Sequence, residues 1–97
     1  MYTPSVKFEW DTSKAIANEL KHGVSFSEAS EVFDDPNAFH FFDDKHSISE
    51  IRYNVVGASN QRLLFVVYTE QSEGFIRIIS AREAGKYHRR LYEQQDF

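Results

Sequence analysis

The uninterrupted apolar run from Leu63 to Tyr68 constrains the fold of this chain more than any other feature. A run of this kind is typical of a strand that is covered on both faces. Strand patterns precede and follow it at residues 51–55 and 75–81, and short polar segments separate the three. Because connections this short join antiparallel neighbours, the sequence predicts a meander with residues 63–68 as its central strand.

A strand and two helices are expected ahead of the meander. Residues 6–10 alternate between apolar and polar side chains, which predicts a first strand. Asp11 and Gly23 suit the two ends of a helix that runs to about residue 22. A capping box, Ser25 with Glu28, opens a second and shorter helix. The apolar side of the first helix is expected to consist of Ala15, Ile16, Ala17 and Leu20.

The remaining segments complete a mixed fold. Residues 38–42 form a short aromatic strand, residues 43–49 a polar loop and residues 83–94 a C-terminal helix, with turns at 34–37, 59–61 and 70–74. The predicted order is β-α-α-β-β-β-β-α. This is an α+β fold in which helices pack on a curved, mostly antiparallel sheet. A chain of 97 residues is expected to form a single domain, residues 1–97.

Composition excludes several classes of protein. The chain has no cysteine, which excludes a disulfide framework and a thiolate metal site and fits a reducing compartment such as the cytoplasm. The first five residues lack the basic and apolar regions of a signal peptide. No apolar stretch approaches the ~20 residues of a membrane span, so no membrane partner is expected.

Charge is distributed unevenly along the chain. The formal net charge is -4, which argues mildly against nucleic acid as a partner. Residues 1–50, however, hold ten acidic and four basic side chains, whereas residues 51–97 hold five acidic and seven basic ones, including every arginine. Either this is an ordinary solvated surface, or the second half builds a local anion site on an otherwise acidic protein.

The end of the first helix carries a lysine and a histidine. Lys14, Asn18 and Lys21 recur at helical spacing and form a polar stripe, and His22 lies beside it. The stripe is either a solvent-facing surface whose cations offset the helix dipole, or part of a site. An imidazole, an amine and a strand-end arginine are the groups needed to cleave a phosphodiester without a metal.

Three arginines lie on or at the end of predicted strands. Arg52 falls within residues 51–55, Arg77 interrupts an apolar strand, and Arg82 closes that strand. Residues five apart in a regular strand point to opposite faces. Arg77 and Arg82 therefore serve one site only if a bulge or the strand end breaks the alternation. Each arginine is either an edge-face residue or one of a functional group.

Other polar residues carry weaker signals. Tyr68 is either a core residue or a platform on which a base stacks. His40 and His46 lie near Asp43 and Asp44, which gives a weak signal for a metal site, since their spacing matches no common set of metal ligands. No metal and no cofactor are expected. The C-terminal helix adds a basic cluster that suits either phosphate or solvent, namely Lys86, His88, Arg89 and Arg90.

The chain resembles the BrnT toxins in an ordered set of short motifs that runs from about residue 6 to residue 93. No single motif is specific, but their order and spacing are those of the family. The motifs are Phe8-Glu9-Trp10-Asp11, Lys14, Asn18, Lys21-His22-Gly23-Val24-Ser25-Phe26, Glu31-Val32-Phe33-Asp34-Asp35-Pro36, His46-Ser47, Arg52-Tyr53, Val56-Gly57, Leu63-Leu64, Val66-Val67-Tyr68-Thr69-Glu70 and Arg77-Ile78-Ile79-Ser80-Ala81-Arg82.

The resemblance implies a RelE-like fold and the toxin of a type II toxin–antitoxin module. Such toxins are endoribonucleases that arrest translation. Their partner is a BrnA-like antitoxin with a ribbon-helix-helix domain, and operator DNA is bound only through that antitoxin. The resemblance implies catalytic roles for His22, Lys21, Arg52 and Arg82, and we expect Lys14, Arg77 and Tyr68 to bind the RNA substrate. The chain departs from the family in its acidic net charge and in Glu83-Ala84-Gly85, where a basic run is common.

The expected reaction is metal-independent cleavage of RNA by its own 2′-hydroxyl. His22 would act as general acid or base, and Lys21, Arg52 and Arg82 would offset the charge of the phosphorane. The alternative is an interaction module without enzymatic activity, which acts mainly as half of an autoregulatory DNA-binding complex. The catalytic hypothesis requires the end of the first helix to lie over the sheet face that carries Arg52, with Arg82 turned toward it.

Overall fold

The computed structural model describes residues 6–95. Residues 1–5, where no signal-peptide pattern is found, and residues 96–97 lie outside the described part of the chain. The order of elements confirms the predicted α+β fold, with one 3-10 helix (η1) added. The elements are β1 (Lys7–Glu9), α1 (Thr12–His22), α2 (Phe26–Ser30), η1 (Glu31–Asp34), β2 (Phe39–Phe42), β3 (Tyr53–Ala58), β4 (Leu63–Ser72), β5 (Phe75–Glu83) and α3 (Lys86–Glu93).

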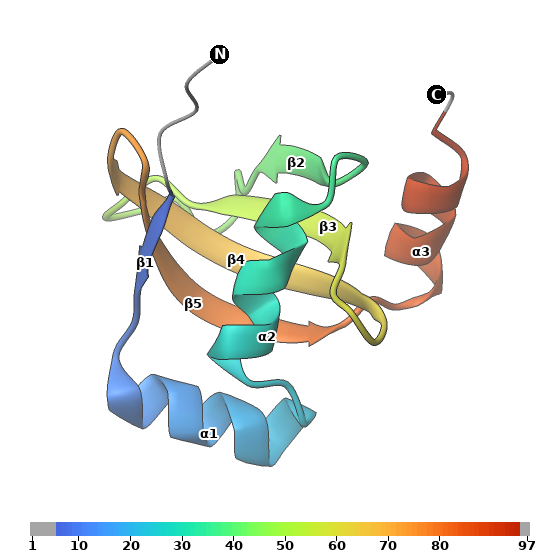
Figure 1. Cartoon of the computed structure of the whole chain (residues 1–97). Coiled ribbons are helices and arrows are strands. Elements are labelled where there is room, and N and C mark those ends of the chain that lie inside the picture. The colour runs from blue at the N-terminus through green and yellow to red at the C-terminus, as the bar shows by residue number, and fades with distance from the viewer. Residues whose placement is uncertain (1–5, 96–97) are drawn as a thin grey trace.

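One five-stranded sheet organises the molecule (Figure 1). Its strand order is β1-β5-β4-β3-β2, so the apolar run that begins at Leu63 lies in the middle strand, as predicted. Strands β2 to β5 pair antiparallel in chain order, whereas β1 pairs parallel with β5. The meander is confirmed, and β1 is the parallel exception in a mostly antiparallel sheet.

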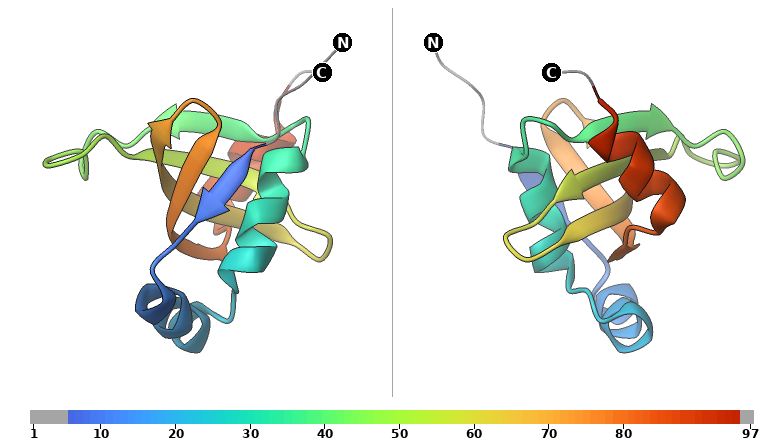
Figure 2. Two further views of the ribbon diagram at one scale, coloured as in Figure 1. Left: turned by 60° about the vertical axis from the view of Figure 1, so that its left-hand side comes forward. Right: turned by 90° about the vertical axis from the view of Figure 1, so that its right-hand side faces the viewer.

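Helices lie on both faces of this sheet (Figure 2). On one face, which we call the α2 face, buried residues of the α1–η1 segment such as Val24, Phe26 and Val32 pack on Val66 and Ile78. Helix α3 lies against the opposite face, which we call the α3 face. Here the core is smaller and consists of Val56, Leu63 and Ala84, with Phe41, Ala58, Phe65 and Tyr92 packed around them.

The contact between β3 and η1 is close enough to require a glycine. A Cβ atom at Gly57 would lie 3.0 Å from the Val32 Cβ and 3.2 Å from that of Ala38. Interiors packed at this density resist added atoms. The glycine lets η1 lie directly against the sheet, which fixes the position of the α2 layer.

Strand boundaries differ from the predicted ones because backbone pairing continues past the apolar pattern. Strands β4 and β5 remain paired as far as Leu64 with Glu83, and the Ala84 N–H then donates to the Leu63 carbonyl. The C-terminal helix consequently begins only at Lys86. The prediction that Arg52 lies within a strand is wrong, since β3 begins at Tyr53.

Helix α1 turns most of its expected apolar side away from the protein, although Ala15 packs against the core as predicted. Ile16 and Leu20 are 58% and 84% exposed, whereas Asn18 is 7% exposed. The Asn18 side chain accepts a hydrogen bond from the Ala81 N–H at 3.0 Å and donates to the Ala81 carbonyl at 2.8 Å. β1 pairs only with Phe75–Arg77. Beyond that point, the side-chain amide of Asn18 makes hydrogen bonds to the backbone at the free edge of β5. No helix in residues 6–95 is long and apolar enough to cross a bilayer.

Candidate functional site

A bulge in β5 brings Arg77 and Arg82 to the same face of the sheet. Val67 pairs with Ser80 and Tyr68 with Ile78, so Ile79 is an extra residue in the ladder. Ile78 and Ala81 both enter the core on the α2 face. By alternation, Arg77 and Arg82 then lie on the α3 face. The bulge is the break in alternation that these two arginines need in order to share a face.

Arg52 lines a small hollow on the α3 face, with a volume of ≈ 140 Å³. Its Nε is buried and has no hydrogen-bond partner within residues 6–95, while its NH2 lies 3.5 Å from the Glu50 carboxylate. Across the hollow, His46 Nδ1 lies 3.0 Å from the Asp43 Oδ2. The residues that line the hollow are Asp43, His46, Arg52, Val67, Ile79 and Ser80.

The loop between β2 and β3 is closed by hydrogen bonds that hold these groups together. The Asp43 N–H donates to the Arg52 carbonyl at 2.9 Å. The Ser47 hydroxyl donates to the Asp43 carbonyl at 2.6 Å and accepts from the Arg52 N–H at 2.9 Å. Both ends of the loop thus share one hydroxyl, so the carboxylate, the imidazole and the guanidinium are positioned by one small turn.

Arg82 lies over an aromatic side chain further along the same face. Its guanidinium carbon is 5.1 Å from the centre of the Phe65 ring, a cation–π distance. His88 of α3 stacks on the same ring, with centroids 4.3 Å apart. Burial, and then the charge of Arg82, lower the pKa of His88. Phe65 therefore carries a cation and a neutral imidazole next to the hollow of Arg52. Arg77 lies at the other end of the face, 3.4 Å from the Glu9 carboxylate.

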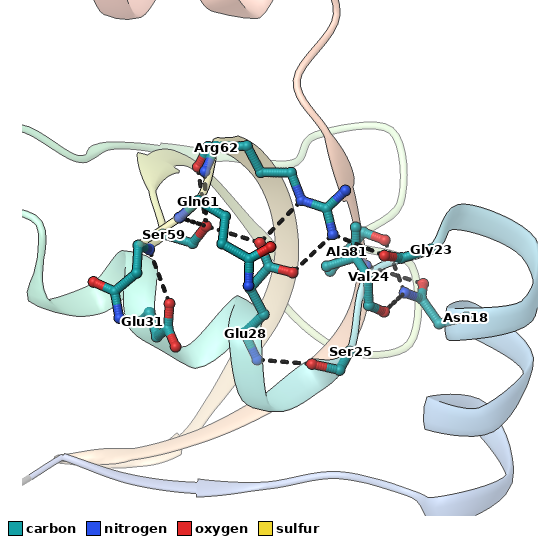
Figure 3. A network of polar contacts seen from close by, with 11 residues as sticks. Asn18, Gly23, Val24, Ser25, Glu28, Glu31, Ser59, Gln61, Arg62 and Ala81 are labelled. Atoms are coloured by element: carbon teal, nitrogen blue, oxygen red, sulfur yellow. Dashed lines mark hydrogen bonds and ion pairs between the residues drawn. The ribbon is translucent and has the colours of Figure 1, made fainter.

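Gly23, which follows Lys21 and His22 at the end of α1, lies in a corner that it shares with Arg62 and Glu28 (Figure 3). Gly23 adopts φ 70° and closes α1 through its N–H to the Glu19 carbonyl. The Gly23 carbonyl accepts from an Arg62 NH2 at 2.7 Å, and Arg62 is also paired with Glu28. Lys14, Lys21 and His22 are exposed. Within residues 6–95, no hydrogen bond or ion pair links His22 with Arg52 or Arg82, and the guanidinium that reaches this corner is that of Arg62.

Tyr68 lies on the α2 face, away from the arginines. Its hydroxyl is 2.8 Å from His40 Nδ1. Burial, together with the charge of Glu70 and the neighbouring Tyr53, raises the pKa of Tyr68 to about 12. Both residues line a larger pocket of ≈ 610 Å³. His40 and His46 therefore belong to different pockets, and within residues 6–95 no three His, Cys, Asp or Glu side chains gather in a way that suits a metal ion.

The arrangement on the α3 face has the parts of an acid–base site for an anionic substrate. An imidazole oriented by a carboxylate can transfer a proton, and guanidinium groups on the same face can bind phosphate oxygens. The sequence alone did not indicate an acid–base role for Asp43 and His46. Their spacing of three residues beside a loop serine was visible, but the closure of that loop against Arg52 was not.

The comparisons with known proteins agree with this fold. The family model described as the ribonuclease toxin BrnT of type II toxin–antitoxin systems matches residues 10–88. The crystal structure of the Brucella abortus ribonuclease toxin BrnT superposes with a TM-score of 0.65 at 24% sequence identity, covering 84% of this chain and 100% of that one. No curated protein matches the chain. The crystal structure establishes likeness of fold, and the family model extends over most of the sequence. The chain belongs to the BrnT family, the ribonuclease toxins of type II toxin–antitoxin systems.

Proposed function

We propose that this toxin cleaves RNA on its α3 face without a metal ion. The substrate's 2′-oxygen would form a bond to the adjacent phosphorus as the bond to the 5′-oxygen breaks. The proton of the 2′-hydroxyl passes to a base, and the leaving 5′-oxygen takes up a proton. The products are a 2′,3′-cyclic phosphate and a 5′-hydroxyl, so the reaction consumes no water at this step.

One observation carries the assignment of groups, namely the contact of His46 with Asp43 in the hollow that Arg52 lines. The carboxylate orients the imidazole for proton transfer. Arg52 and Arg82 are proposed to offset the charge that grows on the phosphorane oxygens. Arg77 would bind the RNA chain further along the face, in competition with Glu9.

The groups first identified in the sequence form a second proposal for the proton transfer. In that proposal His22 is the acid or base, Lys21 assists it, and Lys14 binds the RNA backbone along α1. Two exposed histidines at separate places, His22 and His46, make the proposals easy to separate. Tyr68, given an RNA-binding role from the sequence, faces a different pocket and takes no part in the α3-face proposal.

Matched variants test the assignment in one assay. Purified toxin would be incubated with RNA in EDTA, and the ends of the products would be identified by their phosphate chemistry. We expect His46→Gln to lower the rate by about 10²–10⁴-fold, Arg52→Gln and Arg82→Gln by about 10²–10³-fold each, and His22→Gln to keep the rate within about threefold, because His22 lies outside the hollow.

Three other results would contradict the proposed catalytic groups or the proposed mechanism. A loss of rate in His22→Gln with a retained rate in His46→Gln would move the acid–base group to the end of α1. Loss of cleavage in EDTA, restored by a divalent cation, would overturn the metal-free mechanism. Products with a 3′-hydroxyl would exclude attack by the 2′-oxygen.

The antitoxin partner is proposed to be a BrnA-like ribbon-helix-helix protein, through which the complex would bind operator DNA in the cytoplasm. Exposed Ile16 and Leu20 on α1 offer an apolar contact for a partner protein. They also support the alternative of an inert half of a regulatory complex. Expression of the toxin alone separates the two, since growth arrest that His46→Gln relieves requires catalysis, whereas harmless expression favours the inert module.

A further inference from the structure

The larger pocket lies on the α2 face and is walled by aromatic rings. Phe33 meets Tyr68 edge-on with ring centroids 4.9 Å apart, and Tyr53 stacks on Tyr68 at 5.6 Å. Phe42 meets Tyr53 edge-on at 6.2 Å. His40 adds a further ring against Phe33. Several aromatic rings thus line a pocket of ≈ 610 Å³.

Among the described residues, the lining of this pocket includes one carboxylate, Glu70, and no lysine or arginine. Burial lowers the pKa of His40, so its imidazole is neutral at pH 7, and the pKa of Tyr68 of about 12 keeps that phenol protonated. Glu70 is therefore the single formal charge among the described residues that line it. After burial, the charge of this carboxylate is the next cause that raises the pKa of Tyr68.

Aromatic faces together with one carboxylate suit a cation. A guanidinium stacks on aromatic rings and pairs with a carboxylate, and arginine does both better than lysine. A nucleotide would find rings to stack on, but its phosphate would meet Glu70 and no lysine or arginine of the lining. The N-terminal half of the chain, which supplies Phe33, His40 and Phe42, is itself acidic.

The apolar residues at the rim of the pocket favour a peptide over a free amine as its ligand. Val6 and Phe42 border the pocket and are 47% and 51% exposed. Apolar rim residues of this kind cover the chain on either side of an anchoring side chain. The pocket volume also falls within the range of sites that enclose more than one functional group.

We propose that this pocket binds an arginine side chain of a partner polypeptide, with the guanidinium between the aromatic walls and Glu70. The site lies on the sheet face opposite to the arginines of the α3 face and takes no part in RNA cleavage. Its occupant is basic, whereas the occupant of the α3 face is an anion. This inference goes beyond the proposed function and stands if that function fails.

A pair of tripeptides tests the proposal on the full chain. The probes are acetyl-Ala-Arg-Ala-amide and the same peptide with citrulline, which keeps the shape of arginine but lacks its charge. Binding would be followed through the aromatic NMR signals of Tyr53, Tyr68 and His40. We expect saturable shifts with the arginine peptide and an affinity about tenfold lower for the citrulline peptide, from the loss of the cation–π and ionic contacts.

Two glutamates of the same hairpin provide matched variants. Glu70 lines the pocket and Glu73 does not, and both are exposed. We expect Glu70→Gln to weaken the arginine peptide by about fivefold and Glu73→Gln to leave its affinity within about twofold. Equal effects of the two changes, or equal binding of the citrulline peptide, would overturn the role of the cation.

Other probes distinguish the alternative occupants. Equal affinity for free argininamide would overturn the polypeptide part of the proposal. Tighter binding of uridine or adenosine 5′-monophosphate at the same rings would make the pocket a nucleotide site and overturn the proposal altogether. Because the readout is a set of ring signals, none of these results depends on ribonuclease activity.

Discussion

At the scale of single residues, the Glu28 carboxylate pairs with Arg62 instead of capping the helix as its position in the sequence suggested. The sequence predicted a capping box, and half of it is confirmed, since the Ser25 hydroxyl accepts from the Glu28 N–H at 3.0 Å. The Glu28 carboxylate, however, accepts from Arg62 Nε at 3.0 Å and NH2 at 2.8 Å, and from the Ser59 hydroxyl. A buried carboxylate is more stable with these charged and neutral donors than with a single backbone N–H. It therefore joins α2 to the turn before β4.

The ion pair of Glu28 with Arg62 should make the free energy of unfolding fall at acidic pH. The hydrogen bonds from Arg62, against the effect of burial, lower the pKa of Glu28 from its unfolded value of 4.5. Its contribution to the free energy of unfolding is thus complete above 4.5 and is lost as the pH falls toward the lower folded pKa. We expect Glu28→Gln to cost about 1–3 kcal/mol at pH 7 and to flatten the fall in stability below pH 5, as measured by urea unfolding.

A matched control for this prediction is Glu19→Gln, which removes an exposed carboxylate of α1. This change should cost no more than about 0.5 kcal/mol and keep the acid dependence of the parent. If both variants lost the same stability at pH 7, general charge effects rather than the Arg62 pair would explain the result.

At the scale of elements, α1 shows how tertiary contacts override an amphipathic pattern. The helix buries Asn18 and exposes Ile16 and Leu20. The caps at Asp11 and Gly23 were predicted and are confirmed, because capping depends on the few residues nearest to the helix ends. The buried side was not predictable, since it depends on the free edge of β5, a strand more than fifty residues further along the chain.

Two substitutions on α1, a buried Asn to Leu and an exposed Leu to Asn, should affect stability in the opposite order from the one that hydropathy alone predicts. Asn18→Leu would leave the Ala81 N–H and two carbonyl groups without their partners and should cost about 2–3 kcal/mol. Leu20→Asn changes a side chain that is 84% exposed and should alter the free energy of unfolding by about 0.5 kcal/mol or less. Thermal or urea unfolding of the two variants measures the difference, and a larger loss from Leu20→Asn would show that α1 packs by its apolar side.

The bulge in β5 is the second element-scale feature that decides the site. An alternating pattern indicates which residues share a face only while the pairing is regular. Ile79 interrupts that pairing and moves Arg82 to the face of Arg77. The positions of the arginines indicate that an irregularity is needed but not where it lies, because Ile78-Ile79 reads as two ordinary strand residues.

At the scale of the whole molecule, the formal net charge is -4, so in the proposed mode of binding RNA contacts only the few arginines of the α3 face. RNA affinity should therefore depend on a few phosphate contacts and fall steeply with salt. For about three contacts, the affinity for a 2′-O-methyl RNA, which cannot be cleaved, should drop by about 15- to 20-fold between 50 and 200 mM salt. Fluorescence anisotropy with a labelled oligonucleotide measures this dependence.

The same titration checks which arginines contribute. Arg52→Gln and Arg82→Gln should each reduce the slope of log affinity against log salt by about 0.7. Lys14→Gln, on exposed α1, should leave the slope unchanged if RNA lies on the α3 face. A reduced slope with Lys14→Gln and an unchanged one with Arg52→Gln would instead place the RNA along α1.

The sequence by itself determined the central strand, the meander around it, the caps of α1 and the family to which the chain belongs. These features rest on local propensities and on patterns that are read along a few neighbouring residues. The tertiary structure alone decided which side of α1 is buried and on which face Arg82 lies. It also decided that His46, Asp43 and Arg52 share one hollow, whereas Arg62 contacts Gly23 at the end of α1. Each of these depends on backbone pairing or loop closure between distant segments, where the hydrogen bonds of one residue are supplied by another element.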